Sequence, residues 1–520
     1  MGDRSGRTAA DQSGRSRDRG VCLASVAVSG LPALPARVPP GRPPARPGRR
    51  EGHRRGRADR PDGAPPATPR PRRHLAPGDT STPHPPQRTD ERSRPMSLQI
   101  AHLHAVEILD SRARPTLAVT LTTADGARVR VGVPSGASTG TREAVELRDG
   151  DPARYDGQGV RTAVGHVNGE IAEALTGRTY ASLADVDRAL TDLDGSATKS
   201  RLGANAIVGV SLAAARAEAL LAGREPWQHL AALAGTTPRL PVPHFNVVNG
   251  GAHAANDLDF QEFMLAPLGA PDLPEAVRAG AEVYARLKAR LAAEGHTTGL
   301  GDEGGFAPAV DSPETVLRLL VEAIADAGYT PGRDGVAIAL DPAASEFRHA
   351  DDGLYHVAGD ALTSDRLIDR YEEIVDRFPV WSIEDGLAED DWDGWVRLTE
   401  RLGHRVQVMG DDIFVTNPGI IGEAIDRKLG NSALIKVNQI GTVTETLDAM
   451  RICREAGYTR MVSHRSGETD DSFIADLATG TGCGQLKSGA PARGERVAKY
   501  NRLIEIAAAR PSLAYGLEAR

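Results

Sequence analysis

The stretch from Val406 to Pro418 reads VQVMGDDIFVTNP. Its first half has the unbroken apolar character of a buried strand, and it ends in two adjacent acids, Asp411 and Asp412. A single acid at a strand end is most often a loop residue or the cap of the next helix. The stretch indicates a fold because the same pattern recurs along the last third of the chain.

Further short apolar segments also end in, or carry, a chemically active side chain. They are GVAIALD with Asp341, VWSIED with Glu384, ALIKVNQ with Lys436, RMVSHRS with His464, Arg465 and Ser466, and GQLKSGA with Lys487. Most are followed by a segment with helical spacing, as in repeated βα units. We therefore predict an α/β fold with a C-terminal (β/α)8-type barrel, whose parallel strands bring their carboxyl ends to one rim.

The preceding part of the chain has a different order. Alternating segments at Ile100–Thr123 and Ala127–Gly136 predict strands, and the spacing changes to helical between Val160 and Leu221. This order predicts an N-terminal α+β domain over residues 96–234, a linker at Thr236–Pro243, and a barrel domain over residues 235–520.

Residues 1–95 contain 20 Arg, no Lys, 9 acids and no aromatic residue. Such a segment buries too little apolar surface to offset its ordering entropy, so we predict a disordered Arg/Pro-rich head. Three interpretations stay open: a nucleic-acid-binding arm, a weak export signal at Val21–Ala36, and an over-long start with the true beginning at Met96. We favour the last.

The whole chain has a net charge of -8 although its head is basic, so the body is strongly acidic. An acidic body argues against nucleic acid as the main partner. The three cysteines have neither metal-binding nor disulfide spacing, and the sequence shows no apolar run long enough for a membrane span. We expect a cytoplasmic protein, with a secondary cell-surface or secreted pool as an open alternative.

Three of the strand-end acids, Asp341, Glu384 and Asp411, lie on successive predicted strands. If they meet at the barrel rim, their mutual repulsion calls for a cation. Hard oxygen ligands favour Mg²⁺.

The chain resembles the enolase family over roughly Ile100 to Ala508. The resemblance is carried by SGASTG (135–140), NGGAHAANDLDFQEFM (249–264), GDEGGFAP (301–308), GDDIFVTNP (410–418), IKVNQIGT (435–442), SHRSGET (463–469) and GQLKSGAPARGER (484–496). It implies an N-terminal α+β domain and a barrel with an irregular start. It also implies reversible dehydration of 2-phospho-D-glycerate to phosphoenolpyruvate with two Mg²⁺, in a homodimer or higher homo-oligomer.

The resemblance also implies residue roles. Asp341, Glu384 and Asp411 match ligands of the first metal, and Ser138 matches a ligand of the second. Lys436 matches the base, and Glu303, supported by Glu262, matches the acid. Side chains matching substrate contacts are His253, Gln261, Glu262, Lys436, His464, Arg465, Ser466 and Lys487.

Two expectations concern protonation. Nearby Mg²⁺ and Lys487 should lower the pKa of Lys436, and Glu262 and Glu303 should share a proton, so that one stays an acid near pH 7.

The sequence departs from the family pattern at Ala113–Arg114 and Gly386–Leu387. If Ala113 replaces a glycine with positive φ, it is strained. Open alternatives are a Mg²⁺ barrel acting on another hydroxy acid, a divergent paralogue with weak activity, and a surface-binding protein.

Overall fold

The computed structural model describes residues 97–136 and 140–517. Its N-terminal part contains a four-stranded sheet in the order β3-β2-β1-β4. The strands are β1 (Leu98–Leu109), β2 (Pro115–Thr123), β3 (Arg128–Gly132) and β4 (Thr179–Tyr180). β1, β2 and β3 form an antiparallel meander, as their alternating sequence predicted.

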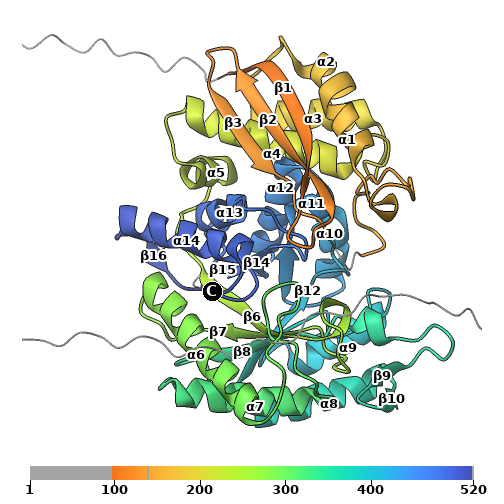
Figure 1. The fold of residues 1–520 in the computed structure, drawn as a ribbon, viewed down its shortest axis with the longest axis vertical. Helices are drawn as coiled ribbons and strands as arrows, with labels where there is room; N and C mark the ends of the chain where they lie inside the picture. Colours follow the sequence, from red (N-terminus) through yellow and green to blue (C-terminus); the bar gives the residue numbers. More distant parts are fainter. Residues whose placement is uncertain (1–96, 137–139, 518–520) are drawn as a thin grey trace, which may run out of the picture. The chain divides into compact units, whose positions relative to one another are not determined.

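Helices cover this sheet on one side (Figure 1). They are α1 (Arg161–His166), continued by the π-helical turn η2 (Val167–Ile171) and α2 (Ala172–Leu175), then α3 (Leu183–Asp194) and α4 (Ala204–Leu221). The next helix, α5 (Pro226–Ala234), packs against α4 rather than against the sheet. α4 packs closely on the sheet at Gly209, where a Cβ would lie 2.6 Å from Val119. Within the described residues, α4 is also the one helix apolar and long enough to span a membrane, but 83% of that window is buried in the fold, as in a core helix.

The C-terminal part is a closed barrel in the order β11-β12-β13-β14-β15-β6-β7-β8. Its strands are β6 (Val242–Asn249), β7 (Glu262–Ala266), β8 (Ala337–Asp341), β11 (Val380–Glu384), β12 (Gln407–Gly410), β13 (Ser432–Ile435), β14 (Thr459–Ser463) and β15 (Gln485–Lys487). β7 runs antiparallel to both β6 and β8, whereas the other neighbours pair in parallel. The expected irregular start of the barrel is confirmed.

Helices follow the barrel strands (Figure 1). They are α6 (Leu273–Ala293), α7 (Pro313–Asp326), α8 (Ser364–Arg377), α9 (Trp392–Leu402), α10 (Pro418–Asp426), α11 (Val437–Ile440), α12 (Val443–Glu455), α13 (Phe473–Thr481) and α14 (Gly494–Ala509). Several begin at a side-chain cap; for example, Asn417 accepts hydrogen bonds from the backbone N–H groups of Gly419 and Ile420. The last two residues of VQVMGDDIFVTNP are therefore the cap and the first residue of α10.

The predicted linker is partly wrong. Within it, β5 (Arg239–Leu240) pairs in parallel with β16 (Ala514–Tyr515), and Val242 already belongs to β6. The local sequence, which is rich in proline, did not predict β5, because the strand with which β5 pairs lies at the other end of the domain. A hairpin of β9 (Tyr355–Val357) and β10 (Asp360–Leu362) follows β8.

Ala113, in the turn between β1 and β2, has a φ of 58°, so the strain expected from the sequence is present. Replacing Ala113 with glycine is expected to stabilise the protein by about 1 kcal/mol, because glycine adopts this conformation without steric cost. The measurement is the thermal midpoint of unfolding. Ala113→Ser is the matched control and should give no gain. Equal midpoints for wild type and Ala113→Gly would contradict the prediction.

Asp187, a buried residue of α3, joins the two parts of the fold. Its Oδ2 accepts hydrogen bonds from Thr444 N (3.0 Å) and Thr444 Oγ1 (2.6 Å) at the start of α12. Burial raises the pKa of Asp187 to about 6 from its usual 3.8. The folded state therefore holds this proton more tightly than the unfolded state, so stability contributed by protonated Asp187 is lost as the pH rises from about 4 to about 6.

Asp187→Asn keeps an acceptor for Thr444 and removes the titration. We expect this variant to be more stable than wild type at pH 7, by roughly 3 kcal/mol, and to lack the loss between pH 4 and 6. Denaturant unfolding across this pH range checks the prediction. Asp192→Asn, at an exposed position on the same helix, is the control. Parallel pH profiles for wild type and Asp187→Asn would refute it.

Candidate active site

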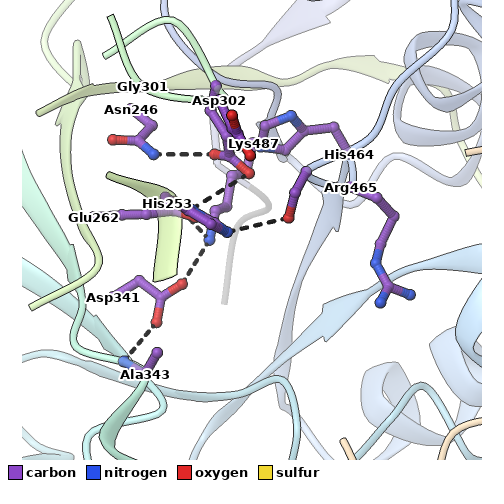
Figure 2. Close-up of polar contacts among 12 residues, drawn as sticks. Asn246, His253, Glu262, Gly301, Asp302, Asp341, Ala343, His464, Arg465 and Lys487 are labelled. Carbon is purple, nitrogen blue, oxygen red and sulfur yellow. Dashed lines mark hydrogen bonds and ion pairs between the residues drawn. The ribbon is translucent and has the colours of Figure 1, made fainter. Parts of the chain in front are cut away.

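Several predicted site residues meet at one end of the barrel, around Lys487. The Lys487 Nζ lies 2.9 Å from Glu262 Oε2 and 3.0 Å from Asp341 Oδ2 (Figure 2). It also lies 2.7 Å from Glu384 Oε1, and all four side chains are buried. Asp341, Glu384 and Lys487 are the last residues of β8, β11 and β15, as the parallel pattern predicted. Glu262 reaches the same rim from the first position of β7, because that strand runs antiparallel.

Lys436, directly after β13 and half-buried, forms an ion pair with the buried Asp411, directly after β12. The other Asp411 oxygen accepts a hydrogen bond from Gln439 Nε2 at 2.8 Å. Burial lowers the pKa of Lys436, but the nearby carboxylates, Asp411 foremost, together outweigh it, and the net shift is upward. Lys487 acts in the expected direction and lowers this pKa, but the sequence did not reveal the close contact with Asp411; the lowering expected from bound Mg²⁺ stays a prediction.

The predicted metal ligands are not one tight triad. The acids that approach each other within 4.8 Å are Asp385, Asp411 and Asp412, while Asp341 and Glu384 share Lys487. Asp385 accepts hydrogen bonds from the backbone N–H groups of Asp411 (2.8 Å) and Asp412 (2.9 Å), and it thereby fixes the backbone at the end of β12. Ser138 lies outside the described residues.

These side chains nevertheless fit a divalent cation with oxygen ligands. Glu384 Oε2 is buried and has no hydrogen-bond partner among the described residues. Burial, and then the nearby Asp341 charge, raise the pKa of Glu384 well above its usual range. An unpaired buried carboxylate oxygen beside further carboxylates is a donor set that suits Mg²⁺, with Asp341, Glu384 and Asp411 as the residues that would hold it.

A second cluster joins His253 to the predicted acid pair. His253 Nδ1 lies 3.4 Å from Glu262 Oε1 and 3.8 Å from Glu303 Oε1. Burial and the neighbouring Glu303 charge raise the pKa of Glu262. Burial also acts to raise the pKa of Glu303, but His464 and His253 outweigh it, and the result is well below the usual range. The pKa values of the two carboxyls are therefore moved in opposite directions, upward for Glu262 and downward for Glu303.

The remaining predicted residues surround this pair. His464 Nε2 lies 3.1 Å from Glu303 Oε2, Asn246 donates to the same oxygen at 3.0 Å, and Ser466 Oγ lies 3.1 Å from His253 Nε2 (Figure 2). Gln261 is buried beside Glu262, and its Oε1 has no hydrogen-bond partner within the described part of the chain.

Arg496, which was given no role from the sequence, holds the backbone of the SHRSGET segment in place by hydrogen bonds. Its fully buried guanidinium donates to the carbonyl oxygens of Arg465 and Ser466, both at 2.6 Å, and contacts His464 Nδ1. A guanidinium has no acceptor, so Nδ1 of His464 must accept and the ring proton sits on Nε2, facing Glu303. Burial lowers the pKa of His464 to about 4, which keeps the ring neutral.

Arg465 differs from the other predicted substrate contacts in the direction of its side chain. Its guanidinium points away from His253, Glu262 and Lys487 (Figure 2) and is bound instead by Glu143 and Asn438. Glu143 was also missed by the sequence reasoning, although it lies only three residues beyond SGASTG. Asp385 and Arg496 were also given no role from the sequence, although both lie in segments that it singles out. Asp385 is the second acid of VWSIED, and Arg496 ends the GQLKSGAPARGER motif.

Comparison with known families agrees with this architecture. Residues 100–230 match the family model described as "Enolase, N-terminal domain". Residues 237–514, more than half of the chain, match "Enolase, C-terminal TIM barrel domain". With both models matched in order, and with the irregular barrel and its acid-rich rim in place, the chain belongs to the enolase family.

Proposed function

We propose that this protein is a phosphopyruvate hydratase, a lyase that reversibly dehydrates 2-phospho-D-glycerate to phosphoenolpyruvate with Mg²⁺. The observation that carries the proposal is the pairing of two lysines with carboxylates at one end of the barrel: Lys436 with Asp411, and the buried Lys487 with Glu262, Asp341 and Glu384. One lysine can exchange a proton while the other holds the negative charge of a substrate carboxylate in place.

Lys436 is the proposed base. A proton on the carbon next to a carboxylate is only weakly acidic, because its loss places a second negative charge on the carboxylate oxygens. Bound Mg²⁺ would supply positive charge at those oxygens. Asp411 stabilises the ammonium form of Lys436, so proton uptake requires that the Asp411 carboxylate be drawn off the lysine Nζ. In the reverse direction the same ammonium returns the proton.

The carboxyl pair of Glu262 and Glu303 is the proposed acid. The departing hydroxyl group needs a proton, and a pair of buried carboxyls that shares one can supply it. Because the pKa of Glu262 is raised and that of Glu303 is lowered, we assign the proton to the pair rather than to Glu303 alone. The neutral His464, held by Arg496, keeps its Nε2 toward Glu303 and would orient that carboxylate.

The proposed phosphate contacts are Arg465 and Ser466, whose carbonyl oxygens are fixed by Arg496. A guanidinium matches phosphate oxygens in geometry and charge. This choice favours a phosphorylated hydroxy acid over an unphosphorylated one.

The decisive experiment follows the ultraviolet absorbance of phosphoenolpyruvate when purified protein is mixed with 2-phospho-D-glycerate and Mg²⁺. We expect product formation that EDTA abolishes and added Mg²⁺ restores. No product at any Mg²⁺ concentration would refute the proposed reaction. A hydroxy acid without a phosphoryl group is the control substrate, and its faster turnover would point to a different reaction on the same barrel.

A further inference from the structure

The proposed phosphate-binding side chain, Arg465, is already bound by a carboxylate of the same chain. Glu143 Oε2 accepts from the Nη1 group of Arg465 at 3.0 Å, and Glu143 Oε1 accepts from Nη2 at 3.1 Å. Arg465 is buried and Glu143 is nearly so, with exposed side-chain fractions of 3% and 9%. Two parallel N–H···O bonds from one guanidinium are also the geometry in which arginine binds phosphate. Glu143 therefore occupies the donors that a phosphoryl group would use.

Glu143 is held in this position by further donors. Its Oε1 also accepts from the backbone N–H of Gly140 at 3.2 Å and from Gln439 Nε2 at 3.3 Å. The same Gln439 nitrogen donates to Asp411 at 2.8 Å. Arg465 is thus linked by contiguous hydrogen bonds through Glu143 and Gln439 to Asp411, the carboxylate that pairs with Lys436.

The orientation of Arg465 agrees with this role. In Figure 2 its guanidinium points away from the cluster formed by His253, Glu262 and Lys487. Glu143 forms an ion pair with this guanidinium. We propose that Glu143 is an internal competitor for Arg465, which a substrate must displace and which thereby selects ligands that carry a phosphoryl group. This inference rests on the proposed function, because it assigns Arg465 to the phosphate of that substrate.

The selectivity follows from charge. A carboxylate carries one negative charge and two acceptor oxygens, whereas a phosphate monoester near pH 7 carries about -1.5 to -2 and three acceptor oxygens. A phosphoryl group can therefore replace Glu143 at the guanidinium with a net gain, whereas a singly charged acid only exchanges like for like. A singly charged acid gains too little at Arg465 to displace Glu143, so Glu143 disfavours the binding of ligands without a phosphoryl group.

The test uses Glu143→Gln, which keeps the size of the side chain and removes its charge. Inorganic phosphate is titrated by calorimetry into the full-length protein with saturating Mg²⁺. We expect the variant to bind phosphate at least about tenfold more tightly than wild type, because a charge-assisted pair no longer competes. In turnover assays its KM for 2-phospho-D-glycerate should fall, while kcat does not rise. A purely structural role would instead lower kcat or stability and leave phosphate affinity unchanged.

Two further variants make the result specific. Glu170→Gln removes an exposed pair of the same geometry, in which Arg201 donates at 2.8 and 2.9 Å, and it should leave phosphate binding unchanged. Adding Arg465→Gln to Glu143→Gln should abolish the gain.

Unchanged or weaker phosphate binding in Glu143→Gln would overturn the proposal, and so would a gain that survives the loss of Arg465. Absence of turnover in every sample would refute the proposed reaction separately, since the phosphate titration needs no catalysis.

Discussion

Replacing Lys436 with alanine is expected to lower kcat for 2-phospho-D-glycerate by about 10⁴-fold, with little change in KM. The reason is that the proposed proton acceptor is removed, while the residues proposed to hold the substrate, Lys487 and Arg465, remain. Steady-state absorbance assays give both constants. A second readout is the exchange of the substrate C2 proton with deuterated water, which should be lost together with turnover.

Lys436→Arg separates proton transfer from structure. Arginine keeps a positive charge for the Asp411 carboxylate, but it does not release its proton in the accessible pH range, so it should be as inactive as alanine while retaining the fold. Lys288→Ala, at an exposed position on α6, is the surface control. Near-normal turnover by either Lys436 variant would assign the base to another residue.

The second large effect is expected at Glu384. Glu384→Gln should abolish Mg²⁺-dependent turnover, because an amide is a poor replacement for a carboxylate ligand. In EDTA, however, the variant should be more stable than wild type by roughly 1–3 kcal/mol, the cost attached to a buried unpaired polar group. Its amide can donate from the position of the unpaired Oε2, and its carbonyl oxygen can still accept from Lys487.

Thermal unfolding with and without Mg²⁺ checks both halves of this prediction. Wild type should gain stability on addition of Mg²⁺, since a ligand of the folded state shifts unfolding by mass action, and Glu384→Gln should not. Glu372→Gln, at a position on α8 that pairs with Arg401, is the control and should keep the Mg²⁺ response. A variant that is less stable than wild type in EDTA, or that retains the full Mg²⁺ shift, would contradict the argument.

The departure from the family pattern at Ala113 shows how local sequence reasoning succeeds. The family pattern has a glycine where this chain has Ala113, so we expected strain if that position has a positive φ, and the structure has 58°. This expectation needed only the family pattern and the conformational limits of a single residue. The predicted linker shows the opposite case, because Arg239–Leu240 is a strand only through its pairing with Ala514–Tyr515, far away in the sequence.

The site residues show the same contrast between positions that the local sequence predicts and positions that depend on distant contacts. Strand-end positions of Asp341, Glu384 and Lys487 followed from the repeated apolar pattern, since parallel strands share one rim. The antiparallel course of β7, which brings Glu262 to that rim from a strand start, left no periodic signal of its own. The upward shift of the Lys436 pKa among the chain's own groups depends on an atomic contact with Asp411, which the types of residue nearby do not reveal.

The sequence by itself determined the barrel, the rim to which its functional residues belong and the oxygen-rich chemistry found there, because these follow from periodicity, residue type and the direction of strands. Only the tertiary structure decided which charges pair: Lys436 with Asp411, Lys487 with three carboxylates, and Arg465 with Glu143. Electrostatic partners are set by distances of a few ångströms between side chains that lie tens to hundreds of residues apart, and no local pattern encodes those distances.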